Sequence, residues 1–295
     1  MGMWDDIKKS FNSGSSLTKL IYINVGFFIF ISLVAITGFL LANTVITDTT
    51  LKFLAVPASL QELMLKPWTL ITYMFLHKDI WHILFNMLWL YWFGSIFLQL
   101  LDQRKLVAVY LIGGICGAFL YILFFNIFPV FTDIVHESIA IGASASVMAV
   151  VVAVAAYAPN YPIKLFLFGS IKIKYIALGI FALTSFMDFS VNSGGKIAHI
   201  GGAMFGYIYS IKLMQGKDLG KRANNIIDFF ATLFKPRKKM KVTYKNSTND
   251  HEYNKMKADR QAKINAILDK ISKGGYDSLT KEEKDELFRE SQKKS

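Results

Sequence analysis

Two side chains that could carry out nucleophilic catalysis each stand near the start of an apolar segment. Ser144 follows Gly142 and opens a run of Ala, Val, Gly and Ser, and His199 is followed by Gly201 and Gly202. A serine hydroxyl is a poor nucleophile unaided, and a neutral imidazole can act as its general base. We therefore predict Ser144 as the nucleophile and His199 as the base. No carboxylate is placed to orient His199, which indicates a two-residue arrangement rather than a triad.

A second polar group opens another apolar segment. His82 and Asn86 are four residues apart and so share one face of a helix, and His77 lies just before it. Together with the backbone N–H of Ser144, the side chains of His82 and Asn86 could donate hydrogen bonds to the oxyanion of a tetrahedral intermediate. We therefore predict that His82 and Asn86 form the oxyanion site.

Each of these signals has a more ordinary interpretation. A serine near a helix end often bonds back to its own helix. A histidine or asparagine can simply join two membrane helices, and Gly202-x3-Gly206 is a common helix-packing motif. The joint occurrence of the polar groups favours a functional site, because ionisable groups inside a membrane are costly and usually face a cavity or the interior of the bundle.

The composition of the chain is that of a membrane protein. Of its 295 residues, 53% are hydrophobic and 15% aromatic, and the mean hydropathy is +0.38. Charged residues make up 18% and crowd into the last quarter, so the net charge of +12 describes a tail and some loops. We expect these basic residues to contact membrane lipids and set topology, and we expect no nucleic-acid partner. Cys116, the single cysteine, lies in an apolar run and is expected to be a packing residue.

Hydropathy predicts an all-α, polytopic fold with six transmembrane helices. The first is long enough to cross a hydrocarbon core of roughly 30 Å. A long, partly apolar loop at 43–70 separates it from the second. We expect the helices at about 19–42, 80–101, 106–128, 141–158, 175–189 and 198–214.

Basic residues mark one side of this bundle. They cluster before the first helix, after the second, after the fourth and after the sixth, which places both termini in the cytoplasm. The helices that carry His82, Ser144 and His199 then all start at the outer face. We therefore expect these side chains to lie at a similar depth and to converge.

Four regions are predicted along the chain. Residues 1–18 form an N-terminal helix at the membrane interface, 19–216 the six-helix core, 217–245 a basic interfacial linker, and 246–295 a small cytosolic helical appendage. In the appendage, Gly274 and Gly275 should end one helix, and Thr280 with Glu283 should form the capping box of the next. Docking or regulation is its expected role. The N-terminus does not have the pattern of a cleaved signal peptide.

Three motifs in order resemble the rhomboid family of intramembrane serine proteases. They are His77-x4-His82-x3-Asn86, Gly142-x-Ser144, and Ala198-His199-x-Gly201-Gly202-x3-Gly206. The resemblance covers residues 19–216. It implies Ser144 as nucleophile, His199 as base, His82 and Asn86 at the oxyanion site, and a membrane-lying first loop that contains Trp68.

The chain departs from the family pattern at three positions. Ala145 follows the nucleophile where the family often has Gly, and Thr69 follows Trp68 where many members have Arg. Met148 stands where some members carry a Tyr that packs on the catalytic His; a thioether can still contact an imidazole. Ala145 can affect the position of the nucleophile, Met148 that of the base, and Thr69 the anchoring of the first loop.

We therefore expect the protein to be a hydrolase, a serine-type endopeptidase that cleaves its substrates within the membrane. Its substrates would be transmembrane-anchored proteins cut near the outer face, with no cofactor and no metal. The expected location is a multi-pass position in a bacterial inner membrane; the oligomeric state is left open. The alternatives are a non-proteolytic, rhomboid-like protein that binds transmembrane clients, or a transporter, including a metal transporter that would use His77, His82, His136 and His199.

Overall fold

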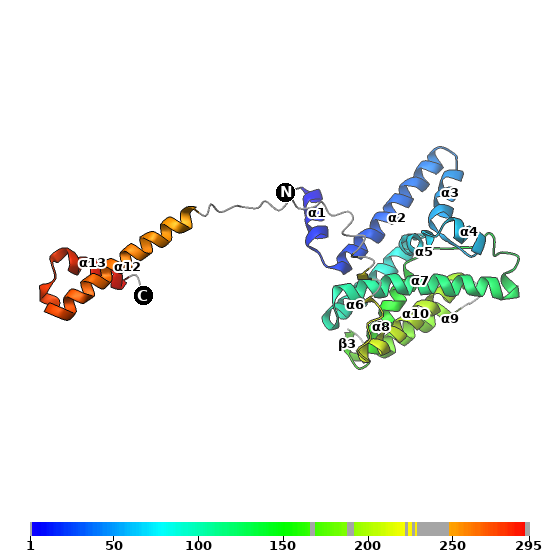
Figure 1. Cartoon of the computed structure of the whole chain (residues 1–295). Helices are drawn as coiled ribbons and strands as arrows, with labels where there is room; N and C mark the ends of the chain where they lie inside the picture. The colour runs from blue at the N-terminus through cyan, green and yellow to red at the C-terminus, as the bar shows by residue number, and fades with distance from the viewer. Residues whose placement is uncertain are drawn as a thin grey trace. The chain divides into compact units, whose positions relative to one another are not determined.

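The computed structural model describes residues 2–165, 169–187, 192–221, 224–225, 228 and 248–292. The chain divides into two compact units, Met1–Lys235 and Pro236–Ser295. The apolar and basic part of the predicted interfacial linker, at 229–241, lies outside the described residues. Each unit is helical, as the sequence predicted (Figure 1).

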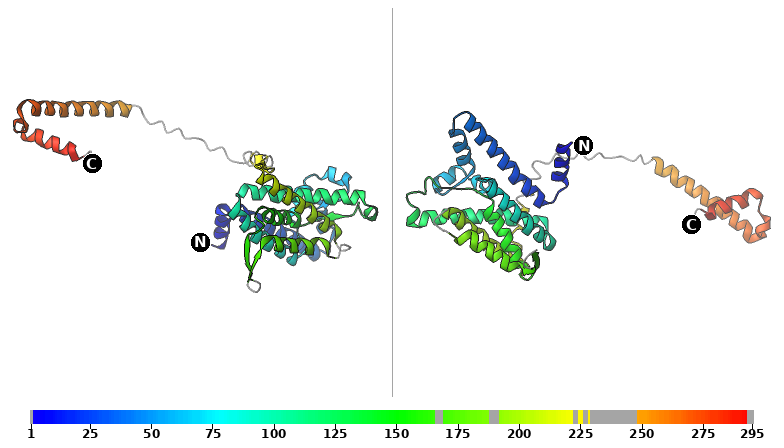
Figure 2. Two further views of the ribbon diagram at one scale, coloured as in Figure 1. Left: turned by 90° about the horizontal axis from the view of Figure 1, so that it is seen from below. Right: turned by 180° about the vertical axis from the view of Figure 1, so that it is seen from behind.

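The first unit is built from long helices joined by short ones and two small antiparallel sheets. β1 pairs with β2 and β3 with β4; the second pair forms a hairpin between α8 and α9, visible in Figure 2. The helices are α1 (Met3–Ser13), α2 (Ser16–Leu40), α3 (Val45–Leu54), α4 (Leu60–Leu65), α5 (Thr69–Thr72), η1 (Tyr73–Phe75), α6 (Ile80–Leu100), α7 (Gln103–Ile127), η2 (Pro129–Phe131), α8 (Ser144–Tyr157), α9 (Ile173–Phe186) and α10 (Ser193–Met214). The strands are β1 (Val56–Pro57), β2 (Ile139–Ala140), β3 (Pro162–Leu165) and β4 (Gly169–Lys172).

Three helices, α2, α6 and α7, are long and apolar enough to cross a membrane. α8 and α9 are apolar but have only 14 residues each, and α10 has 22 residues that include several polar ones. Large apolar side chains are exposed along the lipid-facing sides of these helices, including Phe30, Leu33 and Leu178. The molecule is thus an integral membrane protein, and the count of six spans stays a prediction.

Small residues form the centre of the bundle, where α7, α8 and α10 pack together. A methyl group added at Gly113 of α7 would lie 2.2 Å from the Cβ atom of Ala149 on α8. One added at Gly206 of α10 would lie 2.3 Å from the carbonyl oxygen of Ala149. Such contacts bring backbones close together, which is how helices associate where the surrounding lipid is as apolar as the side chains.

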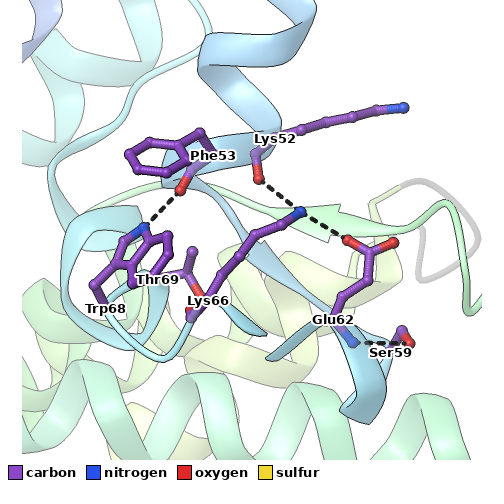
Figure 3. Close-up of polar contacts among 7 residues, drawn as sticks. All are labelled: Lys52, Phe53, Ser59, Glu62, Lys66, Trp68 and Thr69. Carbon is purple, nitrogen blue, oxygen red and sulfur yellow. Dashed lines mark hydrogen bonds and ion pairs between the residues drawn. The ribbon is translucent and has the colours of Figure 1, made fainter. Parts of the chain in front are cut away.

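The segment between α2 and α6 is an ordered set of short helices rather than the plain loop predicted at 43–70. The indole N–H of Trp68 donates to the carbonyl of Phe53 over 2.9 Å, and the rings of these residues lie 5.0 Å apart (Figure 3). Lys66 donates to the carbonyl of Lys52 at 3.4 Å and pairs with Glu62 at 3.0 Å. These polar contacts hold the segment in place, although Thr69 follows Trp68 where many members of the family have Arg.

Several predicted helix starts were wrong: α2 begins at Ser16 rather than 19 and α8 at Ser144 rather than 141, and side-chain caps account for two others. α10 begins at Ser193, five residues before the expected 198, because the Asn192 side chain accepts a hydrogen bond from the N–H of Gly195 at 3.2 Å. Gly194 and Gly195, which lie before the predicted start, are thus in its first turn. α7 begins at Gln103 rather than 106, because the carboxylate of Asp102 caps the N–H of Lys105 at 2.9 Å.

The second unit contains a helical hairpin. α12 (Thr248–Gly274) and α13 (Lys281–Gln292) are joined by η3 (Tyr276–Ser278). α12 ends at the predicted glycines, and Gly275 has a φ of 74°, a left-handed conformation that suits glycine. The predicted capping box is confirmed: the N–H of Thr280 donates to Glu283 at 2.9 Å, and the N–H of Glu283 donates to Thr280 Oγ1 at 3.3 Å.

Candidate active site

Ser144 is the first residue of α8, and the backbone before it is fixed on two sides. The N–H of Gly142 donates to the carbonyl of Tyr73 at 2.9 Å, and β2 just before it pairs with β1. Gly142 has a φ of 132°, which side-chain-bearing residues rarely adopt. A Cβ atom at this position would lie 3.0 Å from Nε2 of His82 and 3.5 Å from Oγ of Ser144. The glycine therefore lets the His82 ring approach the serine.

His199 lies in α10, and glycines hold this helix against two neighbours. A Cβ atom at Gly202 would lie 2.1 Å from the carbonyl oxygen of Ala145 on α8. One at Gly201 would lie 2.7 Å from the carbonyl oxygen of Cys116 on α7. Neither position has room for a side chain, so these glycines set the distance between the helix that carries His199 and the helix that begins at Ser144.

The four predicted catalytic and oxyanion residues line one cavity of about 420 Å³. Ser144 and Met148 come from α8, His199 from α10, and His82 and Asn86 from α6. α6 also contributes an aromatic wall, and α9 closes another side; these lining residues are Trp81, Phe85, Trp89, Ile180 and Thr184. The structure thus brings the residues together as the topology argument predicted.

In this arrangement the Ser144 hydroxyl makes no hydrogen bond to His199 or to any other group within the part of the chain that the structure describes. Catalytic hydrogen bonds are often long before substrate binds and tighten in the complex. Met148 is buried and lines the same cavity as His199, at the position that the family resemblance singled out.

His77 does not line the cavity but packs against His82, which does. It is 2% exposed, and its ring meets that of His82 edge to face with 5.1 Å between centroids. Burial, and then the neighbouring His82, lower the pKa of His77 to about 4, so it is neutral at pH 7.

Sequence reasoning missed two groups that contact the histidines, because both belong to the backbone. The carbonyl oxygen of Thr184 lies 3.2 Å from Nδ1 of His199, and the N–H of Lys78 donates to Nδ1 of His82 at 3.4 Å. Asn86 is 7% exposed and donates one amide N–H to the carbonyl of His82 at 2.8 Å. A side-chain amide has two N–H donors, which leaves Asn86 a second one.

Comparison with known protein families matches residues 65–216 to the Rhomboid domain, which is just over half of the chain. The chain belongs to the rhomboid family. The matched residues of this rhomboid contain all four of the predicted catalytic and oxyanion residues that line the cavity. Residues 247–293 match a different domain, described as a family of unknown function (DUF6576), and this match coincides with the α12–α13 hairpin.

A curated relative of this rhomboid is presenilin-associated rhomboid-like protein A, mitochondrial, from Danio rerio. It is 31% identical over 142 residues, which are 46% of this chain and 34% of the relative. The match thus spans about a third of the relative's length. Within the described residues, no group of three or more His, Cys, Asp or Glu side chains is placed to hold a metal ion.

Proposed function

We propose that this rhomboid is an intramembrane serine endopeptidase that cleaves transmembrane-anchored proteins near the outer face of the membrane. The observation that supports the proposal most strongly is the shared cavity of Ser144, His199, His82 and Asn86 between apolar helices. A cavity that only bound a transmembrane client would have no need of both a serine and a histidine at this point.

The proposed reaction follows from the types of these side chains. Oγ of Ser144 attacks the carbonyl carbon of the scissile bond while His199 takes its proton. The negative charge that forms on the substrate oxygen is stabilised by His82 and by the second N–H of Asn86. His199 then gives its proton to the leaving amine. Water, deprotonated by His199, attacks the acyl carbon, and His199 returns this proton to Oγ of Ser144 as the acid product leaves.

The proposed substrates are membrane segments that can unwind. A peptide bond inside an intact helix is shielded by its own hydrogen bonds, so cleavage requires small or helix-destabilising residues at the cut. The apolar and aromatic walls of the cavity from α6 and α9 suit a chain that arrives laterally from lipid.

We also infer an orientation with both termini in the cytoplasm, on the distribution of basic residues. The proposed compartment is a bacterial inner membrane, to which the mitochondrial relative gives no support. Accessibility of cysteines introduced at Asp133 and Lys217 tests the orientation. Asp133 should react with an impermeant thiol reagent added outside intact cells, whereas Lys217 should react only after permeabilisation.

The function is tested by labelling the protein in detergent with a fluorophosphonate and by following cleavage of a transmembrane reporter. Wild type, Ser144→Ala and His199→Ala are compared after each is shown to be folded. We expect labelling and cleavage in wild type and loss of both in the two variants. Folded wild-type protein that neither labels nor cleaves would contradict the proposal.

A non-proteolytic client-binding protein is the second candidate. The observation that favours it is Met148, which lines the cavity at the position where some members of the family carry a Tyr that packs on the catalytic His. A reporter that co-purifies uncut with wild type and equally well with Ser144→Ala would support this alternative.

A further inference from the structure

The two histidines in the cavity are each held by a backbone group at Nδ1, and the two backbone groups are of opposite kinds. His199 faces a carbonyl oxygen and His82 faces an N–H. In a neutral imidazole one nitrogen carries hydrogen and the other accepts, so the partner of one nitrogen decides the chemistry of the other.

For His199 the partner is the carbonyl oxygen of Thr184, at 3.2 Å from Nδ1. A carbonyl oxygen can only accept, so Nδ1 carries the hydrogen and Nε2 keeps the lone pair that a general base needs. The carbonyl is available because Thr184 lies in the last turn of α9, which ends at Phe186. The last four carbonyls of a helix have no partner within the helix.

For His82 the partner is the backbone N–H of Lys78, at 3.4 Å from Nδ1. An N–H can only donate, so Nδ1 accepts and Nε2 carries the hydrogen. Asp79 caps α6, because its carboxylate accepts a hydrogen bond from the N–H of His82 at 2.9 Å. Lys78 precedes this cap, so the N–H of Lys78 lies outside the helix. A Cβ atom on Gly142 would lie 3.0 Å from Nε2 of His82 and 3.5 Å from Oγ of Ser144, so Nε2–H is on the side of the ring that faces the serine.

We propose that the Thr184 carbonyl and the Lys78 N–H are positioning groups that give the two histidines opposite tautomers. His199 is thereby the base, with a free Nε2, and His82 is the oxyanion donor, with Nε2–H. The assignment of catalytic roles rests on the proposed function, but the tautomers themselves do not. The arrangement also replaces the carboxylate of a serine-protease triad: a backbone carbonyl at the end of α9 orients the base.

The first test is independent of activity. The protein is labelled with ¹⁵N-histidine and studied by NMR at a pH where the rings are neutral, with His82→Gln and His199→Gln used to assign the two signals. We expect His199 to show hydrogen on Nδ1 and His82 to show hydrogen on Nε2. The same tautomer in both rings, or rapid averaging in His199, would overturn the proposal.

The second test weakens the carbonyl itself. In a Ser185→Ala background, residue 185 is replaced by lactic acid, which converts the amide into an ester and makes the Thr184 carbonyl a poorer acceptor. The matched control replaces Leu183, whose side chain is exposed, by its hydroxy acid, which introduces the same ester into α9 two residues earlier. We expect kcat for the reporter to fall about five- to tenfold at 185 with KM unchanged, as for loss of one hydrogen bond.

The controls separate the two proposals. An equal loss of kcat from the ester at 183 would mean that α9 is only a structural support, and the positioning role would be wrong. If folded wild type neither labels nor cleaves, the proposed function fails, and the ¹⁵N spectra still decide the tautomers.

Discussion

The contact between α8 and α10 and the contact between α12 and α13 join helices by different means. At the first, glycine lies directly against backbone: a Cβ atom at Gly202 would lie 2.1 Å from the carbonyl oxygen of Ala145. At the second, ion pairs connect the helices, Lys270 with Glu283 and Arg260 with Glu290. The hairpin buries few apolar side chains, among them Ile267 and Leu279.

This difference shows where the chain tolerates change. In lipid, helices gain little from burying apolar side chains, so close approach of small residues and hydrogen bonds carry the association. In water, exposed ion pairs each contribute about 0–1 kcal/mol and adapt easily to substitution. We therefore expect small changes at the α8–α10 contact to reach the active site and changes in the hairpin to leave it unaffected.

The largest effect is expected from Gly202→Ala. The added methyl group meets the backbone of α8 and must push α10, which carries His199, away from Ser144. We expect loss of reporter cleavage by at least about 100-fold, since small misplacements at a catalytic site cost about this much. The control is Gly26→Ala in α2, where an added methyl group meets no atom within 4 Å. Equal activity of the two variants would contradict the packing argument.

Asn86→Ala should have the next largest effect. It removes the second amide N–H that the proposed oxyanion site uses, and it leaves the α8–α10 contact intact. We expect kcat to fall by about 10²-fold or more, the range seen for loss of one oxyanion donor, with labelling slowed in parallel. Unchanged kcat in the folded variant would mean that Asn86 only joins turns of α6 through its bond to the His82 carbonyl.

The convergence of Ser144, His199 and His82 could be predicted from three features of the sequence: the side-chain types, the expected helix starts, and the distribution of basic residues that assigns each helix start to one side of the membrane. The contacts of Thr184 and Lys78 could not, since a backbone carbonyl or N–H is present at nearly every residue and its use depends on where helices end in space. The start of α10 was misplaced for a related reason. Gly194 and Gly195 favour a loop by propensity, but the Asn192 cap and packing in the bundle keep them helical.

A third prediction concerns acid stability of the bundle. The pKa of buried His77 is lowered to about 4, so the folded state resists its protonation. The contribution of neutral His77 to stability is complete above the pKa of the unfolded state, about 6.5, and is lost as pH falls through the folded pKa of about 4. We expect unfolding to become easier by up to about 3 kcal/mol over this window, and His77→Phe to flatten the dependence. Equal pH profiles of thermal unfolding for both proteins would contradict this.

A smaller effect is expected in the hairpin. The hydrogen bond from Lys270, and then the one from the N–H of Thr280, hold the pKa of Glu283 below its usual range. Stability from this group is therefore present above its unfolded pKa and is lost as pH falls through the lower folded value. We expect Glu283→Gln to speed hydrogen exchange of the first turn of α13 at pH 7 and to leave reporter cleavage unchanged. Faster exchange in α10 as well would argue against independent units.

The smallest effect is expected from deleting residues 244–295. The deletion removes the α12–α13 hairpin, which the structure assigns to its own compact unit and which carries no residue of the cavity. We expect kcat and KM of the purified, folded truncated protein to stay within about twofold of wild type, since less than 0.5 kcal/mol would separate them. Loss of cleavage in the truncated protein, with labelling of Ser144 retained, would instead place the hairpin in substrate capture.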